Sequence, residues 1–324
     1  MNIKQIQSPA DTFDLRFPAG KALDAVGFGT NSVDHLCVVP EYPESSAKTE
    51  ILHYEQLAGG QVATAMIFLA RMGLRTKYIG KVGGDELGRF SLRSFETDAV
   101  DTASVMVERN ASNQCAFIVI DRKSGERTVF SRRDTGLDFR GAELKRDDIC
   151  AGRVLYLDGY DSRGALAAAG WCREAGIPVV IDLDKVVPDC QELIGRVDFL
   201  IVSSNFPSEF TGIDDPVKAF QVLRDHYDGF LAMTLGASGA AAWVGDRCIA
   251  FPGLKIDPVD TTGAGDIFHG GFIYGLLQNW PLEKIMRFSN AAAGLSCMHM
   301  GARTGIRPIP EILRYAATLP TITC

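Results

Sequence analysis

Short apolar runs alternate with segments of helical periodicity along most of this chain, and this alternation limits the possible folds more than any other feature. The runs expected to form strands are residues 24–29, 76–82, 154–157, 179–181, 199–202 and 230–234. The segments with the apolar spacing of helices are residues 61–72, 86–95, 163–175 and 216–227. Successive parallel strands require a crossover, usually a helix. The pattern therefore predicts an α/β protein with a mostly parallel central sheet and helices on both faces.

Two stretches break the alternation, because each carries strand-like patterns without a helix between them. These are His35–Gln56 and Gln114–Arg133, the second with a turn at Lys123-Ser124-Gly125-Glu126. We expect them to form a small β-sheet lid beside the strand ends where such folds bind ligands. The leader up to Gly20 is expected to be a loose arm. The predicted division is a core of residues 21–33, 57–111 and 136–318, and a lid of residues 34–56 and 112–135.

The composition argues against several classes of protein. The formal net charge is −7 and the basic residues are scattered, so a nucleic-acid partner is not expected. No charge-free apolar stretch is long enough for a membrane span, and the first residues lack a signal-peptide pattern. The eight cysteines are widely spaced and expected to be reduced. These features favour a cytoplasmic, globular protein.

The segment from Asp260 to Gly271, DTTGAGDIFHGG, is a small-residue loop that leads into an apolar helix. Gly263, Ala264 and Gly265 have almost no side chain, so the free N–H groups of the first helical turn can face a phosphate. Asp266 follows directly, where its carboxylate could accept a proton from an attacking hydroxyl. Phosphoryl transfer depends mostly on positioning and charge stabilisation, which this arrangement supplies. The alternative is that Asp266 only caps the helix.

The string DTTGAGDIFHGGF resembles the C-terminal signature of the ribokinase-like, PfkB-type carbohydrate kinase family. The paired Gly59-Gly60 before the helix ending LARMG and the opening VGFGTNSVD resemble other elements of that family, in family order from about residue 24 to about residue 310. The resemblance implies a Rossmann-like core with a β lid, and an enzyme that uses ATP to phosphorylate a hydroxyl of a small sugar-like molecule. It also implies Asp266 as catalytic base. A homodimer is expected because open lid edges often pair between subunits.

For the substrate, the resemblance implies contacts from Asp34, from Gly59 and Gly60, and from the following Gln61 and Thr64. The carboxylate can accept hydrogen bonds from two sugar hydroxyls, and the glycines allow close backbone approach. Thr64 stands where the family usually has Asn, in a GGxxATA form similar to that of sulfofructose kinases. Further candidates are Lys48, which sits where those enzymes hold an anionic end, Asp158 at a strand end, and Arg133 and Arg163.

For the nucleotide, Thr234-Leu235-Gly236-Ala237-Ser238-Gly239 resembles the TxGxxG segment that lines the family's ATP site. Thr234, Gly236, Ser238 and Gly239 are therefore expected at ATP. The other nucleotide candidates from the resemblance are Thr261, Asn205 and Asn290.

Metal binding is implied by the same resemblance. The family's NxxE motif, tied to Mg²⁺ and phosphate, is replaced by Asn205-Phe206-Pro207-Ser208, with Glu209 one place later. Glu209 is the magnesium candidate, although Mg²⁺ should arrive mainly on the ATP phosphates. Backbone carbonyls near Asp260 and Thr262 resemble a K⁺ site, together with the loop from Gly301 to Gly305.

Other readings of the sequence remain open. Gly27-x-Gly29 follows a strand, as in nicotinamide oxidoreductases, but Ser32 replaces the third glycine. No P-loop or zinc-hydrolase motif occurs, and His269 and His299 are expected as packed helix residues. A non-catalytic sugar or nucleotide sensor on the same fold is the main rival, and a nucleoside or sulfosugar kinase is a variant of the first reading. The presence of Asp266 beside the glycine loop favours catalysis.

Overall fold

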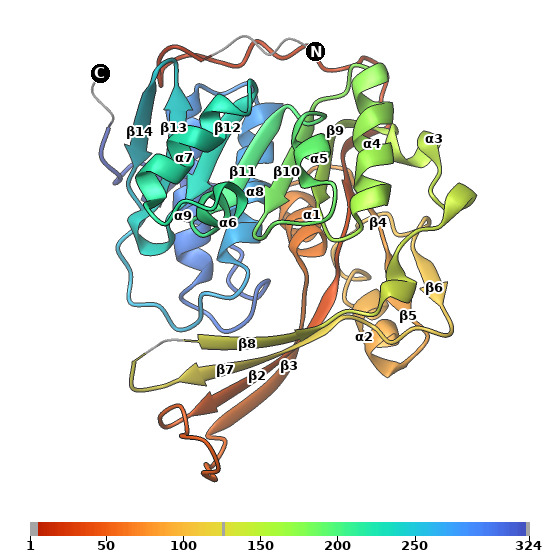
Figure 1. Ribbon diagram of the computed structural model, residues 1–324, viewed down its shortest axis with the longest axis vertical. Helices are drawn as coiled ribbons and strands as arrows, with labels where there is room; N and C mark the ends of the chain where they lie inside the picture. The colour runs from red at the N-terminus through yellow and green to blue at the C-terminus, as the bar shows by residue number, and fades with distance from the viewer. Residues whose placement is uncertain (1–5, 125–126, 322–324) are drawn as a thin grey trace.

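The main sheet of the computed structural model, which describes residues 6–124 and 127–321, has eight strands in the order β14-β13-β12-β11-β10-β9-β1-β4 (Figure 1). The neighbours from β12 to β4 pair in parallel, whereas β13 and β14 form an antiparallel edge. The strands are β1 (Leu23–Phe28), β4 (Thr76–Ile79), β9 (Gly152–Asp158), β10 (Val179–Leu183), β11 (Phe199–Ser203), β12 (Phe230–Thr234), β13 (Ala240–Val244) and β14 (Arg247–Phe251). The predicted mostly parallel α/β sheet is confirmed.

Helices cover both faces of this sheet (Figure 1). The longer ones are α1 (Gln61–Arg71), α4 (Ser162–Glu174), α7 (Pro216–Asp225), α8 (Ala264–Leu277), α9 (Leu282–Ser296) and α10 (Ile309–Ala316). The shorter ones are α2 (Glu86–Arg93), α3 (Arg146–Ile149), α5 (Cys190–Ile194), α6 (Phe206–Thr211) and the 3₁₀ turns Thr135–Leu137, Gly141–Glu143 and Gly236–Ser238. Apolar residues of α1, α8, α9 and α10 form one core cluster, and those of α4, α5 and α7 form a second. Alternate strand residues join opposite clusters, which explains why the strands are apolar throughout.

A second sheet projects from the core and contains four strands in the order β3-β2-β7-β8 (Figure 1). Its strands are β2 (Ser32–Val39), β3 (His53–Gly59), β7 (Cys115–Asp121) and β8 (Arg127–Arg132). One face buries Leu36 and Ile118, while Phe117 and Phe130 on the other face are about half exposed. The sheet therefore has one face turned to the core and one face turned to solvent, on which aromatic rings are exposed. The predicted turn at residues 123–126 lies partly outside the described residues.

The leader was predicted to be a loose arm, and this prediction is wrong for its described part. Phe13 is only 3% exposed, and its ring packs against Phe199, Phe230 and Phe272 at centroid distances of 5.1, 5.0 and 6.1 Å. An aromatic side chain gains enough from burial to hold an otherwise irregular segment against the core.

The predicted strand over residues 76–82 is two strands. β4 belongs to the main sheet, whereas β5 (Lys81–Gly83) pairs with β6 (Met106–Glu108) in a separate two-stranded sheet. Gly80 lies at the break, packed so closely against Tyr78 and Gly29 that a Cβ there would lie 2.1 Å from the Tyr78 hydroxyl oxygen.

The described part of the chain contains neither a membrane-spanning helix nor a disulfide bond. Within residues 6–124 and 127–321, no helix is long and apolar enough to cross a membrane. The cysteines of this part are all free thiols.

Candidate active site

The N-terminus of α8 presents the small-residue loop. Gly263 caps the helix with φ 75°, a left-handed conformation that suits glycine, and a Cβ there would lie 2.4 Å from the Cβ of Ala302. Ala264 N donates to Thr261 O at 3.3 Å, and Gly265 faces open space, with no atom within 4 Å of where its Cβ would be. The first turn is thus bare of side chains on the side where an anion would approach.

Asp266 lies in this first turn and is partly exposed. Burial raises its pKa well above the ordinary carboxyl value, and the charges of Asp182, Asp34 and Asp184 raise it further. Arg303 acts in the opposite direction. A carboxylate with a raised pKa is a stronger base than an ordinary one, which is the property that proton abstraction requires.

Asp34 and the glycine pair meet at the root of the small sheet. Asp34 in β2 is paired with Leu57 of β3, and its Oδ1 accepts a hydrogen bond from the Ser32 hydroxyl at 2.9 Å. A Cβ on Gly59 would lie 2.0 Å from Asp34 Oδ2, and one on Gly60 would lie 2.4 Å from Asn31 Cα. Gly60, which has φ 94°, therefore requires glycine, whereas a side chain at Gly59 would displace the Asp34 carboxylate. Burial raises the pKa of Asp34 to about 6.

Arg303 is a buried guanidinium that the sequence analysis missed. It donates from Nη2 to Gly59 O at 2.6 Å, from Nη1 to the Ser94 hydroxyl at 2.9 Å and from Nε to the Thr64 hydroxyl at 3.3 Å. Thr64 is fully buried, and its hydroxyl accepts this hydrogen bond from Arg303. Arg303 therefore fixes the glycine pair and supplies positive charge near Asp34. A loop arginine gives no periodic signal, so sequence alone would not have singled it out.

Asp158 ends β9 and is almost fully buried, with both oxygens in use. Its Oδ2 accepts from Thr30 N and from the Thr30 hydroxyl, both at 2.7 Å, and its Oδ1 accepts from Tyr160 N at 3.1 Å. These contacts hold the loop after β1 against the end of β9. The predicted substrate contact at Asp158 stays a prediction.

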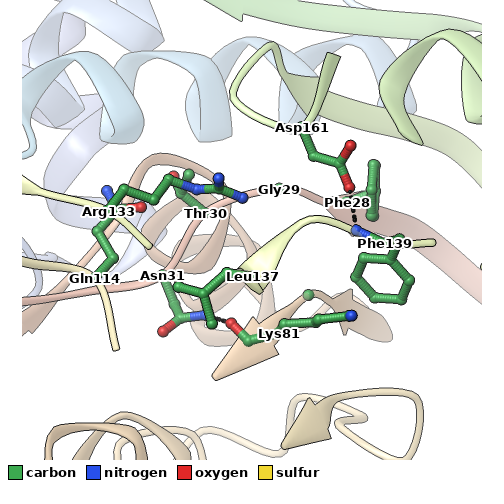
Figure 2. A pocket seen from close by; sticks show the side chains of 11 residues that line it. Phe28, Gly29, Thr30, Asn31, Lys81, Gln114, Arg133, Leu137, Phe139 and Asp161 are labelled. Carbon is green, nitrogen blue, oxygen red and sulfur yellow. Dashed lines mark hydrogen bonds between the residues drawn. The ribbon is translucent and has the colours of Figure 1, made fainter. Parts of the chain in front are cut away.

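A pocket opens beside that loop and is shown in Figure 2, where Arg133 extends toward Gly29 and Thr30. Its wall includes Asp161, whose Oδ2 accepts from Phe139 N at 2.8 Å. Arg133 is paired with Asp138, with Nη1 and Oδ1 2.5 Å apart.

The other two basic candidates lie on the surface. Arg163 is exposed on α4, and Lys48 is exposed in the loop between β2 and β3. The pocket residues do not include either of them.

The nucleotide candidates follow the end of β12. Thr234 ends that strand, and Gly236 and Ser238 form an exposed 3₁₀ turn that ends at Gly239. Gly239 has φ 94°, and a Cβ there would lie 2.2 Å from Phe251 O. Asn290 is buried in α9 and donates to Phe251 O at 2.8 Å, so it supports the strand behind this turn.

The metal candidates have protein partners of their own. Glu209 Oε1 accepts from Val186 N at 3.2 Å, and Asn205 is the exposed residue before α6. Asp260 Oδ1 accepts from Thr262 N at 2.9 Å, and its Oδ2 accepts from Gly301 N at 2.8 Å, which ties the two loops together. The described residues contain no group of three or more His, Cys, Asp or Glu side chains that could hold a metal ion.

The two histidines differ from each other. His269 is buried in α8, as predicted, and burial lowers its pKa to about 4. His299 lies beyond the end of α9 and contacts Arg307, so its prediction as a helix residue is wrong.

Comparisons with known proteins agree with the fold described above. Residues 24–309 match the sequence model of the family described as "pfkB family carbohydrate kinase". Ribokinase of Haemophilus influenzae is 25% identical over 294 residues, covering 89% of this chain and 96% of the relative. A 5-dehydro-2-deoxygluconokinase of Geobacillus kaustophilus is 27% identical, covering 87% and 90%. The structure of Arabidopsis thaliana ribokinase with ribose and ATP has a TM-score of 0.78 at 21% identity, covering 91% and 99%.

Proposed function

Because this chain belongs to the pfkB family of carbohydrate kinases, we propose that it transfers the γ-phosphate of ATP to a hydroxyl of a small sugar-like substrate, with Asp266 as general base. The observation that carries this proposal is the position of Asp266 in the first turn of α8, next to residues 263–265, which carry at most a methyl group. A base and an anion hole side by side are what an in-line phosphoryl transfer needs.

Different residues of the chain bind the sugar, accept the proton, stabilise the phosphate charge and bind the nucleotide. Asp34 and the backbone of Gly59 and Gly60 hold the sugar, because a carboxylate accepts hydroxyl hydrogen bonds and glycines permit close contact. Asp266 then accepts the proton of the attacking hydroxyl. The amides of residues 263–265 stabilise the charge on the transferring group, assisted by the helix dipole. The segment from Thr234 to Gly239 holds the nucleotide.

Cations would act together with the ATP phosphates. Glu209 is bound to a backbone amide and no three-ligand cluster occurs in the described chain, so Mg²⁺ fits here only with phosphate oxygens and water as its main ligands. When bound, Mg²⁺ neutralises phosphate charge. The loops joined through Asp260 and Gly301 are the candidate place for K⁺, through backbone carbonyls.

The small sheet is proposed to act as the lid and to join two copies of the chain. It contacts the loop before α8, because Arg127 in β8 donates to the Thr261 hydroxyl. On its outer face the side chains of Tyr54, Phe117 and Phe130 are each about half exposed to solvent. Exposed apolar patches of this kind are typical of interaction surfaces.

The test is conversion of ATP to ADP across a panel of ketoses, aldoses, sugar acids, sulfosugars, sugar phosphates and nucleosides. We expect turnover with at least one member, and a loss of about a hundredfold or more in Asp266→Asn, because general base catalysis contributes about that much. Asp257→Asn, an exposed carboxylate in the preceding loop, is the matched control. Near-wild-type turnover in a folded Asp266→Asn protein would remove Asp266 from the mechanism. Saturable sugar binding without turnover would favour a sensor.

A further inference from the structure

A buried carboxyl group, that of Asp182 near the end of β10, accepts two hydrogen bonds on one oxygen. Its Oδ2 lies 3.1 Å from Gln61 Nε2, 3.4 Å from the Tyr156 hydroxyl oxygen and 3.5 Å from His269 Nδ1. Asp182 is 6% exposed and Tyr156 is fully buried, so water competes little for these contacts. Gln61 and Tyr156 therefore hold the carboxyl group from two sides, while His269 Nδ1 donates to Gly265 O at 2.7 Å. A polar residue within the apolar run Val179–Leu183 is the sequence signal that could have revealed it.

These contacts determine the orientation of the Gln61 amide. Gln61 Nε2 donates to Asp182 Oδ2, so Gln61 turns its NH₂ group toward Asp182 and its oxygen away from it. That oxygen, Oε1, is buried and has no hydrogen-bond partner within residues 6–124 and 127–321. Buried acceptors are nearly always paired in folded proteins. The missing donor is then expected to come from a ligand.

The unpaired oxygen belongs to the proposed sugar site. Gln61 is the first residue of α1 and follows Gly60 directly, and the charge of Asp182 acts on Asp266. We infer that Asp182 is a positioning residue that fixes the Gln61 amide, so that Gln61 Oε1 accepts a hydrogen bond from a substrate hydroxyl. This inference rests on the proposed function, and it adds that the substrate carries a hydroxyl donor at this point besides the one that is phosphorylated.

The inference makes a prediction about substrate analogues. A fluorine in place of the recognised hydroxyl can accept but cannot donate, and a hydrogen can do neither. Loss of the donor leaves Oε1 buried and unpaired, which should weaken binding about tenfold to a hundredfold. At one position of the sugar, the compound with the hydroxyl should therefore bind much more tightly than the analogues with fluorine or hydrogen.

The experiment measures sugar binding by calorimetry and kcat/KM in the full chain. The probes are D-ribose, D-fructose and any other panel sugar that binds, each with its monodeoxy and monofluoro analogues. In Gln61→Met, which keeps the size but removes the acceptor, the hydroxyl preference at one position should fall to within about threefold. In Asp182→Asn the Asn amide can donate to Gln61 Oε1, so the Gln61 amide should turn over, and the same preference should be lost.

A charge-conserving swap separates positioning from structure. Gln61→Glu alone places two carboxylates together and should bind the sugar poorly. Gln61→Glu combined with Asp182→Asn restores one donor and one acceptor with unchanged net charge, so the hydroxyl preference should return. A merely structural Asp182 would not be rescued in this way.

The outcomes are distinct. An unchanged hydroxyl preference in folded Gln61→Met, or failure of the swap to restore it while Asp182→Asn has lost it, overturns the inference and leaves the kinase proposal intact. If no panel sugar binds to the wild-type protein, both proposals fail.

Discussion

At the residue scale, a substitution at Gly265 should affect catalysis and stability in opposite directions. Its Cβ position is open and its φ is not left-handed, so Gly265→Ala introduces no strain and should stabilise α8 by up to about 1 kcal/mol. The added methyl would occupy the space where the phosphate approaches the amides. We expect a folded protein with an unchanged or raised unfolding temperature and a loss of kinase activity of at least about tenfold.

The matched variant is Gly263→Ala. Here the left-handed φ of 75° and the contact with Ala302 should lower stability as well as activity. Full activity in Gly265→Ala would show that phosphate does not lie at this turn.

Asp34 gives a prediction about pH. Burial raises its pKa to about 6 from 3.8, so the folded state binds this proton more tightly than the unfolded state does. As the pH rises from about 4 to about 6, the wild-type free energy of unfolding should therefore fall by roughly 3 kcal/mol because of this group. Asp34→Asn removes this cost, so the variant should be more stable than wild type at pH 8 and nearly equal to it near pH 4, as measured by urea unfolding.

A carboxylate with the opposite behaviour provides the control. Backbone hydrogen bonds from Tyr42 and Ser124 lower the pKa of Asp121. Asp121→Asn should therefore lose stability relative to wild type at pH 8 and lose less at low pH. If the two variants respond to pH with the same sign, the burial argument for Asp34 is wrong. Asp34→Asn should also bind sugar poorly.

At the element scale, the N-terminal segment is predicted to act as part of the core. Phe13 lies against strands β11 and β12 through Phe199 and Phe230 and against α8 through Phe272. Phe13→Ala should lower the free energy of unfolding by about 3 kcal/mol or more, because it leaves a cavity between the three rings. The measurement is the urea midpoint, with Phe17→Ala, which is partly exposed, as the milder comparison. A change below about 1 kcal/mol would return this segment to the status of a loose arm.

The sequence predicted the parallel strands well because each has both faces covered and is therefore apolar along its length. It did not predict β13, which lies between β12 and the edge strand β14, since Ala240, Ala241 and Ala242 have low strand propensity. Their small size fits a sheet packed closely on both sides. The leader was missed for a related reason. One aromatic residue in a polar segment has no period, and its burial depends on a gap between distant elements.

The site shows the same division. Gly263, Gly265 and Asp266 could be predicted because they are contiguous and their chemistry is local to one helix end. Arg303 could not, because it acquires its role from partners far away in the chain, such as Gly59. Asp182 leaves only the signal of a polar residue in an apolar run, which does not reveal its distant partner Gln61. Long-range hydrogen bonds leave no spacing in the sequence.

At the scale of the whole molecule, the candidate site forms where the small sheet meets the core. Asp34 comes from the small sheet, Gln61 and Asp266 come from helix N-termini, and Asp182 comes from a strand end. The sheet rests on the loop at Gly301, where a Cβ would lie 2.2 Å from Leu57 Cδ1. In the proposed kinase, movement of the small sheet would therefore displace Asp34 and the loop near Asp260 together.

In the proposed dimer, the outer face of that sheet is the contact surface between the two copies. Phe117 and Phe130 are paired across β7 and β8 and stay 50% and 53% exposed, while Leu36 and Ile118 bury the inner face. A second copy of the chain covering this face by two-fold symmetry would remove both rings from water. We expect the wild-type protein to sediment at twice 35.1 kDa, and Phe117→Glu combined with Phe130→Glu to sediment at 35.1 kDa with its helical content unchanged. Val217→Glu, at a 78% exposed position on α7, should leave the mass at the dimer value, which shows that the effect is not one of added charge alone. A wild-type mass of one chain at micromolar concentration would reject the dimer, and the exposed rings would then need a different partner.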